Sequence, residues 1–180
     1  DIRADASVAI AALRHAGTSV QLLSGDGTRA VDRVAAAVGI HQATGSCSPD
    51  GKLDRLRALQ EKGHRVAMVG DGLNDGPVLA AAHASFAFGL AVPLAQARSD
   101  FVVLGDQLQR IPQALLLARK SLRIVRQNLG WAAGYNIICV PLALVGLMPA
   151  WLAGLGMALS SLLVVLNAAR LSRPLPGGDT

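Results

Sequence analysis

This chain of 180 residues contains 43 consecutive positions without Asp, Glu, Lys or Arg, from Gln127 to Ala169. All 29 charged side chains therefore lie in the other 137 positions, at a density typical of a soluble domain. A bilayer core about 30 Å thick needs about 20 helical residues, so the run is long enough for two crossings. We predict a soluble part followed by a membrane hairpin. The alternative is a buried apolar helix pair in a soluble protein, but uncharged runs of this length are rare outside membranes.

Pro149 marks the expected turn of the hairpin. Proline disrupts the interior of a helix but suits its first turn, which predicts spans near 128–148 and 150–169. Residues 107–126 carry five basic and no acidic side chains, and Arg170 follows the second span. Because basic residues stay on the cytoplasmic side, we expect a multi-pass protein with its soluble part and C-terminus in the cytoplasm. The expected partner of these basic flanks is the anionic surface of the lipid bilayer.

The soluble part, residues 1–106, alternates helical patterns with short apolar runs. Such alternation predicts an α/β fold with a parallel sheet covered by helices. Gly17, Gly39 and Gly63 mark the expected ends of three of the helices. The expected helices are 7–16, 28–38, 50–62, 74–82 and a basic linking helix at 107–127, and the expected strands are 20–23, 65–69, 84–88 and 101–104; two membrane helices within 128–171 and a disordered tail at 172–180 complete the chain.

Polar residues follow two of the expected strands, where parallel sheets collect their chemistry. One cluster is Ser24-Gly25-Asp26, and the other runs from Gly70 to Pro77 with the sequence GDGLNDGP. The two carboxylates and the amide of the second cluster, Asp71, Asp75 and Asn74, form an oxygen-rich set that suits Mg²⁺. A phosphate reacting there would be held by the metal, by Ser24 and by a lysine, for which Lys52 is the candidate.

Several other functions are disfavoured by composition. Residues 1–106 hold 10 basic and 11 acidic side chains, so the net charge of +5 comes from the membrane flanks and gives no reason to expect nucleic-acid binding. Only six aromatic residues are present, too few for a base-stacking surface. The acidic residues of Gly70–Gly76 would repel a pyrophosphate without a metal, which argues against a dinucleotide site.

The segment MVGDGLNDGPVLAAAHASFAFG, with SGD upstream and MALSSLLVVLNAARL downstream, resembles the C-terminal part of heavy-metal-transporting P-type ATPases. The resemblance covers nearly the whole chain and is strongest to the copper pumps that supply respiratory oxidases. It implies a partial haloacid-dehalogenase-like phosphorylation domain, then the last two transmembrane helices, in a bacterial inner membrane. It also implies Mg²⁺ and ATP as cofactors, Cu⁺ or Ag⁺ as the transported ion, and a copper chaperone as a partner.

The resemblance assigns roles to individual residues. Asp71 and Asp75 would hold Mg²⁺, Asn74 would organise the phosphate, and Lys52 would neutralise the phosphoryl group. The phosphate would also contact the turn Ser24-Gly25-Asp26, with serine in place of the family's threonine, and Gly72. The transported ion would pass Tyr135, Asn136, Met157, Ser160 and Ser161; a soft thioether without nearby carboxylates favours Cu⁺. Taken alone, the spacing of these membrane residues favours helix packing over an ion path, and it is the resemblance that favours the ion path.

The family's phosphorylated aspartate, in a DKTGT motif, is absent from this sequence. We therefore expect a fragment of a longer pump, inactive in isolation, whose nucleotide-binding domain and earlier helices lie elsewhere. Two alternatives remain open. One is a membrane-anchored phosphatase of the same fold, and the other is a non-catalytic remnant or regulator of a metal pump.

Overall fold

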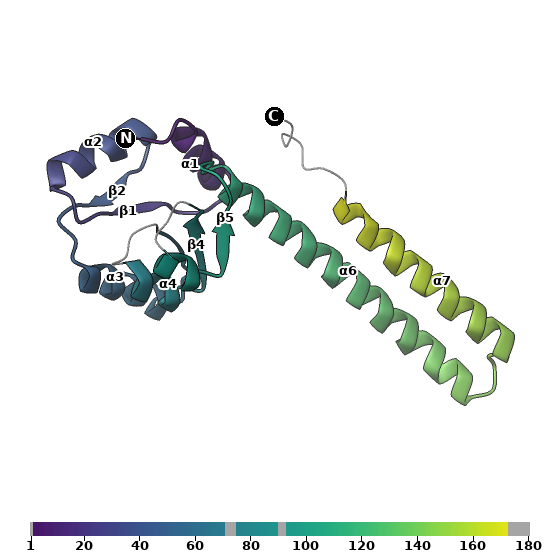
Figure 1. Ribbon diagram of the computed structural model, residues 1–180. Coiled ribbons are helices and arrows are strands. Elements are labelled where there is room, and N and C mark those ends of the chain that lie inside the picture. The colour runs from purple at the N-terminus through teal and green to yellow at the C-terminus, as the bar shows by residue number, and fades with distance from the viewer. Residues whose placement is uncertain (1, 71–74, 90–92, 173–180) are drawn as a thin grey trace. The chain divides into compact units, whose positions relative to one another are not determined.

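The computed structural model describes residues 2–70, 75–89 and 93–172 (Figure 1). The chain divides into two compact units, Asp1–Pro112 and Gln113–Thr180. The boundary falls just inside a long helix, Arg110–Leu144. In chain order the elements are α1 (Ala6–His15), β1 (Gln21–Leu23), α2 (Thr28–Val38), β2 (Gln42–Thr44), α3 (Pro49–Glu61), β3 (Ala67–Val69), α4 (Gly76–Ala81), β4 (Ala84–Phe88), α5 (Pro93–Ala97), β5 (Phe101–Val103), α6 (Arg110–Leu144), α7 (Ala150–Ala169) and the short 3₁₀ helix η2 (Arg170–Ser172).

The described strands of the first unit form two parallel sheets, one of β1 and β2 and one in the order β3-β4-β5. The prediction of a parallel α/β fold is confirmed, although the strands form two separate sheets. Within the described residues, β1 and β3 are each bonded to a neighbouring strand on one side only. Each therefore leaves one edge open to a further strand.

The core of the first unit is assembled from small and branched apolar side chains. Ala6 and Ile10 of α1 pack with Val38 at the end of α2. Leu79 of α4 packs on Ala87 of β4, and both are fully buried. Burial of this kind contributes about 25 cal/mol per Å² of apolar surface, so these contacts hold α1 against α2 and α4 against β4.

The start of the chain is tied to the segment that leads into α6. The guanidinium of Arg3 pairs with the carboxylate of Asp106 and lies 3.8 Å from the ring centre of Phe88. Two residues on, Asp5 Oδ2 accepts a hydrogen bond of 2.9 Å from the backbone N–H of Gln109. These contacts fix the residues immediately before α6 to the first unit.

In the second unit, α6 and α7 form an antiparallel hairpin (Figure 1). The sequence predicts a first span reaching residue 148, but α6 ends at Leu144. Gly146 has a left-handed φ of 74°, and the N–H of Leu147 bonds to the carbonyl of Leu142 at 3.0 Å. This is a Schellman ending, in which a glycine closes the helix before Pro149 is reached. Pro149 then precedes α7, which begins at Ala150 as predicted.

Most apolar side chains of the hairpin are exposed, including Trp151 at 70% and Leu147 at 72%. Among the described residues, one helix, Ala150–Ser172, is long and apolar enough to cross a membrane. In α6 the apolar half is diluted by Gly130, Gly134 and Asn136, so that its crossing remains a prediction.

Candidate functional site

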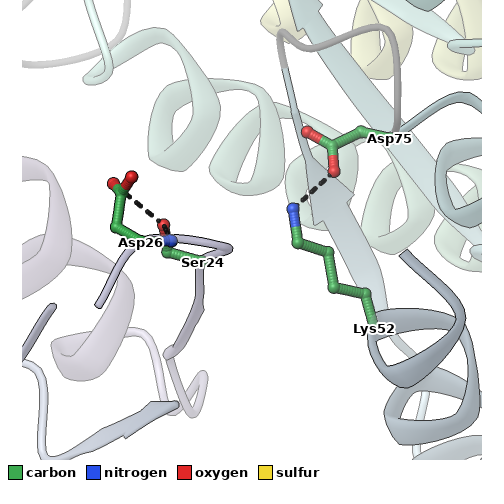
Figure 2. A network of polar contacts seen from close by, with 4 residues as sticks. All are labelled: Ser24, Asp26, Lys52 and Asp75. Atoms are coloured by element: carbon green, nitrogen blue, oxygen red, sulfur yellow. Dashed lines mark hydrogen bonds and ion pairs between the residues drawn. The ribbon is translucent and has the colours of Figure 1, made fainter. Parts of the chain in front are cut away.

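The candidate site lies at the carboxyl ends of β1 and β3. Ser24 follows β1 directly, and Gly70 follows β3. Figure 2 shows two pairs of polar side chains here, Ser24 with Asp26 and Lys52 with Asp75. The prediction that polar groups follow two parallel strands is therefore confirmed for the described members of both clusters.

The first pair forms a tight polar turn. Ser24 Oγ accepts a hydrogen bond from the backbone N–H of Asp26 and donates one to Asp26 Oδ2, both at 3.2 Å. This arrangement is a local side-chain turn that holds the hydroxyl close to the backbone. Gly25, between them, leaves ordinary room, since a Cβ there would lie 3.7 Å from the Cys47 carbonyl oxygen.

A second loop, which sequence reasoning missed, supports this turn. The backbone N–H of Ser46 donates to the Asp26 carbonyl at 2.6 Å, and that of Cys47 donates to the Ser24 carbonyl at 2.9 Å. Gly45 makes the approach possible, because a Cβ there would lie 2.5 Å from Thr28 Cα. The signal in the sequence was Gly45 itself, at the end of a short polar strand without an apolar pattern.

The same loop leads into α3, which carries Lys52. Ser48 caps this helix by accepting a 3.0 Å hydrogen bond from the N–H of Gly51, and Pro49 occupies the first helical position. Serine as cap and proline at the first turn are both favourable there. The side chain of Lys52 is therefore attached near the start of a helix whose first turn is capped.

Lys52 and Asp75 form the central contact of the site. Lys52 Nζ lies 2.7 Å from Asp75 Oδ1, and the two side chains are only 14% and 12% exposed. An ion pair with so little water is screened weakly, and removing one partner leaves the other charge buried and unpaired. The pair therefore fixes both side chains and couples α3 to the start of α4.

Gly70 determines how close the backbone after β3 comes to Asp75. A Cβ at Gly70 would lie 3.0 Å from Asp75 Cβ and 3.1 Å from Asp75 Oδ2. The N–H of Gly70 donates to the Phe86 carbonyl at 3.1 Å and so keeps this residue in line with the sheet. A larger residue would have to displace the carboxylate.

Asp71, Gly72 and Asn74 lie outside the described residues. Within the described ranges, no three His, Cys, Asp or Glu side chains are grouped to hold a metal ion. Of the predicted Mg²⁺ ligands, Asp75 is described; its chemistry suits a hard cation, and one of its oxygens already contacts Lys52. The magnesium site stays a prediction.

The predicted ion-path residues all belong to the second unit. Tyr135 packs over Gly156, where a Cβ would lie 2.8 Å from its hydroxyl, and the hydroxyl donates to the Ala153 carbonyl at 3.4 Å. Ser160 accepts a 3.1 Å hydrogen bond from Trp131 Nε1. The remaining three, Asn136, Met157 and Ser161, are exposed. The structure thus places Tyr135 and Ser160 along the contact between α6 and α7, while their role toward an ion remains a prediction.

Comparison with known proteins gives consistent matches. Residues 1–83 match the family model described as haloacid dehalogenase-like hydrolase. The chain is 45% identical to "Cation-transporting P-type ATPase B" of Mycobacterium tuberculosis, over 94% of this chain and 23% of that protein. It is 40% identical to "Copper-exporting P-type ATPase" of Staphylococcus epidermidis, over 96% of this chain and 22% of that protein.

A solved structure agrees with these relatives. The chain matches the crystal structure of a zinc-transporting PIB-type ATPase with a TM-score of 0.89 and 33% identity, over 96% of this chain and 28% of that one. The chain thus spans about a quarter of the length of the proteins it resembles. Over the section that it spans, the chain belongs to the family of P-type ATPases.

Proposed function

We propose that the chain is the phosphoryl-handling section and a membrane hairpin of an ATP-driven pump for a soft monovalent metal ion, Cu⁺ or Ag⁺. The observation that carries the proposal is the nearly dry Lys52–Asp75 pair at the end of β3, in the same unit as the Ser24 turn at the end of β1. A lysine held in a low-water site can neutralise phosphoryl oxygens far better than one in bulk water.

The nucleophile of this reaction would come from the rest of the protein. A parallel strand added to the open edge of β1 or β3 would end beside the Ser24 turn or the Lys52–Asp75 pair, because parallel strands share their carboxyl edge. An aspartate at the end of that strand is the group we expect to be phosphorylated by ATP. The chain alone should therefore form no phosphorylated intermediate.

Magnesium, when bound by Asp71 and Asp75, would offset negative charge on the phosphoryl oxygens. Side chains of this chain would bind the phosphoryl oxygens directly. The Ser24 hydroxyl would donate to a phosphoryl oxygen in place of Asp26, and Lys52 would bring a second donor from the α3 side.

Substitution of Lys52 tests this role. In the full-length protein that contains this chain, Lys52→Met should lower metal-stimulated ATP hydrolysis about 100-fold or more, the loss typical of a removed charge-stabilising donor. Lys62→Met is the matched control, since Lys62 ends the same helix and is exposed; it should stay within about twofold of wild type. Equal activity of all three proteins would contradict the assignment.

The identity of the transported metal is tested by a separate experiment. Copper-exporting relatives and the thioether of Met157 favour Cu⁺, and the uncharged hairpin offers no carboxylate for a harder ion. The zinc-transporting neighbour favours the alternative, Zn²⁺. Hydrolysis by the full-length protein should rise with Cu⁺ or Ag⁺ under reducing conditions and stay at its basal rate with Zn²⁺. Stimulation by Zn²⁺ alone would replace the copper proposal.

The two non-pump alternatives are separated from the pump by the genomic sequence upstream of the codon for Asp1. An open frame encoding DKTGT and a Cys-Pro-Cys motif supports the pump. A start codon at that position supports a remnant or regulator instead.

A further inference from the structure

A cluster of polar side chains closes the open end of the α6–α7 hairpin. Asn167 Nδ2 donates to Gln127 Oε1 at 3.3 Å and to Asn128 Oδ1 at 2.8 Å. Asn167 Oδ1 in turn accepts a hydrogen bond of 3.2 Å from Arg170 Nη1. Two residues from the middle of α6 and two from the end of α7 and the start of η2 are therefore joined in one chain of hydrogen bonds, at the boundary between the charged and uncharged parts of the sequence.

The direction of these hydrogen bonds is fixed by chemistry. Arginine can only donate, so the Asn167 atom that faces Arg170 must be the carbonyl oxygen. The amide nitrogen of Asn167 then faces Gln127 and Asn128, and both must present their oxygens to it. Their NH₂ groups are left over, and within the described part of the chain neither has a hydrogen-bond partner. The cluster thus offers spare amide N–H donors beside the guanidinium of Arg170.

A concavity opens beside the cluster. It has a volume of about 470 Å³ and is lined by Gln127, Asn128, Trp131, Leu163, Val164, Leu166, Asn167 and Arg170. Its polar lining includes Gln127, Asn128 and Arg170, and its apolar lining includes Trp131 and Leu166, which are 50% and 57% exposed. A ligand that satisfies both sides must have an anionic, oxygen-rich group joined to an apolar body.

The surrounding charge also favours an anion. A second concavity of about 500 Å³ shares Gln127 with the first and is lined by Arg119, Leu122, Arg123 and Arg126. No Asp or Glu occurs anywhere between Asp106 and Asp179, so no carboxylate in this stretch of sequence opposes an anion. The combination of guanidinium and amide donors suits the oxygens of a phosphate.

We propose that Gln127, Asn128 and Arg170 bind the phosphate of an anionic phospholipid, whose acyl chains lie against Trp131 and Leu166. The proposal rests on the proposed function in one respect, namely that the hairpin lies in a membrane. Arg126 and Arg170 immediately flank the uncharged run, so this cluster would lie at the level of the lipid headgroups. The expected ligand is thus a bound lipid of defined position, in addition to the general attraction of a basic surface to a bilayer.

Isosteric variants test the site without removing the cluster. Gln127→Glu and Asn128→Asp keep the oxygen that accepts from Asn167 but replace the outward NH₂ group by a second oxygen, which repels phosphate. Gln113→Glu is the matched control, because it makes the same change on α6 about 21 Å away along the helix axis. Arg170→Gln removes the cation and keeps a long polar side chain.

The measurement is native mass spectrometry of the full-length protein in mild detergent with equal amounts of phosphatidylglycerol and phosphatidylcholine. Wild type and Gln113→Glu should retain phosphatidylglycerol in about tenfold preference, and the Gln127, Asn128 and Arg170 variants should lose that preference. Equal retention of both lipids by wild type, or unchanged preference in all variants, would overturn the proposal. Excess inorganic phosphate should leave the bound lipid in place; displacement by phosphate would indicate a free-anion site instead.

The same preparations separate this proposal from the pump itself. Metal-dependent phosphorylation by ATP is measured beside lipid retention. Selective lipid retention without phosphorylation would leave the lipid site standing and contradict the pump. Phosphorylation with unselective lipid retention would support the pump and contradict the lipid site.

Discussion

At the scale of single residues, the site depends on how closely the backbone and the charged side chains approach one another. Lys52 and Asp75 stand 23 positions apart in the sequence and meet at 2.7 Å, and Gly70 leaves Asp75 little free space. Two glycines therefore matter as much as the charged groups, since Gly45 brings the second loop against the Ser24 turn. The charged residues were predictable from their types, whereas these approaches depend on backbone positions that only the folded chain defines.

Gly70→Ala should disturb the ion pair without removing either charge. The new Cβ at 3.0 Å from Asp75 Cβ is tighter than most real contacts, so the carboxylate must move by a few tenths of an ångström. We expect about a tenfold loss of ATP hydrolysis in the full-length protein, because small displacements at a reacting centre are costly. Gly27→Ala is the control, since a Cβ there meets no atom within 4 Å. Equal rates of ATP hydrolysis by the two variants would show that the close contact between Gly70 and Asp75 does not affect activity.

At the scale of elements, glycine and proline were the most reliable signals. Gly17, Gly39 and Gly63 all have φ between 75° and 82° and follow α1, α2 and α3 as predicted. The helix at 28–38 and the strand at 84–88 have the predicted bounds. Three of the described elements were missed, β2, α5 and η2, because three to five residues are too few to show a period and β2 is polar.

The predicted continuity between the basic helix and the apolar segment that follows it is confirmed as a single helix, since α6 runs unbroken from Arg110 to Leu144. Its start is held by Asp5, a contact over more than 100 positions that no local pattern could predict. The predicted helix began at residue 107, whereas residues 107–109 instead provide the backbone groups that Asp5 and the first turn use.

Asp5→Ala should loosen the start of α6. Loss of a carboxylate that accepts a backbone N–H near a helix start costs about 1 kcal/mol, and Asp54→Ala, at an exposed position of α3, should cost less than about 0.5 kcal/mol. Limited proteolysis of the full-length protein should therefore cut residues 104–109 faster in Asp5→Ala alone. Identical cleavage rates in the two variants would contradict this role for Asp5.

At the scale of the whole molecule, the end of the strand pattern and the uncharged run indicate a soluble part and a hairpin. The division at Pro112 lies close to the predicted boundary at residue 106, because the apolar pattern of the sheets ends there. The separation of the strands into two sheets was not predictable. Strand pairing depends on which strands are present to fill each edge, and a sequence that spans about a quarter of its relatives need not contain them.

The two ends of the α6–α7 hairpin are expected on the cytoplasmic side of the membrane, and its turn on the opposite side. In the full-length protein with its native cysteines replaced, cysteines introduced at Gln113 and Ser172 should react with a membrane-impermeant reagent from the cytoplasmic side. A cysteine at Leu147, in the turn, should react from the opposite side, because both basic flanks are expected to stay in the cytoplasm. Labelling of all three positions from one side would mean that the hairpin does not cross the membrane.

The most direct test of the central claim is acid-stable labelling of the full-length protein by ATP carrying a radioactive γ-phosphate. The claim is that the Lys52–Asp75 site handles a phosphoryl group on behalf of a metal-transporting hairpin. Label should appear on adding Cu⁺ or Ag⁺ and should be lost in Asp75→Asn, with Lys62→Met labelled like wild type. Label that is independent of metal, or that survives unchanged in Asp75→Asn, would contradict the account.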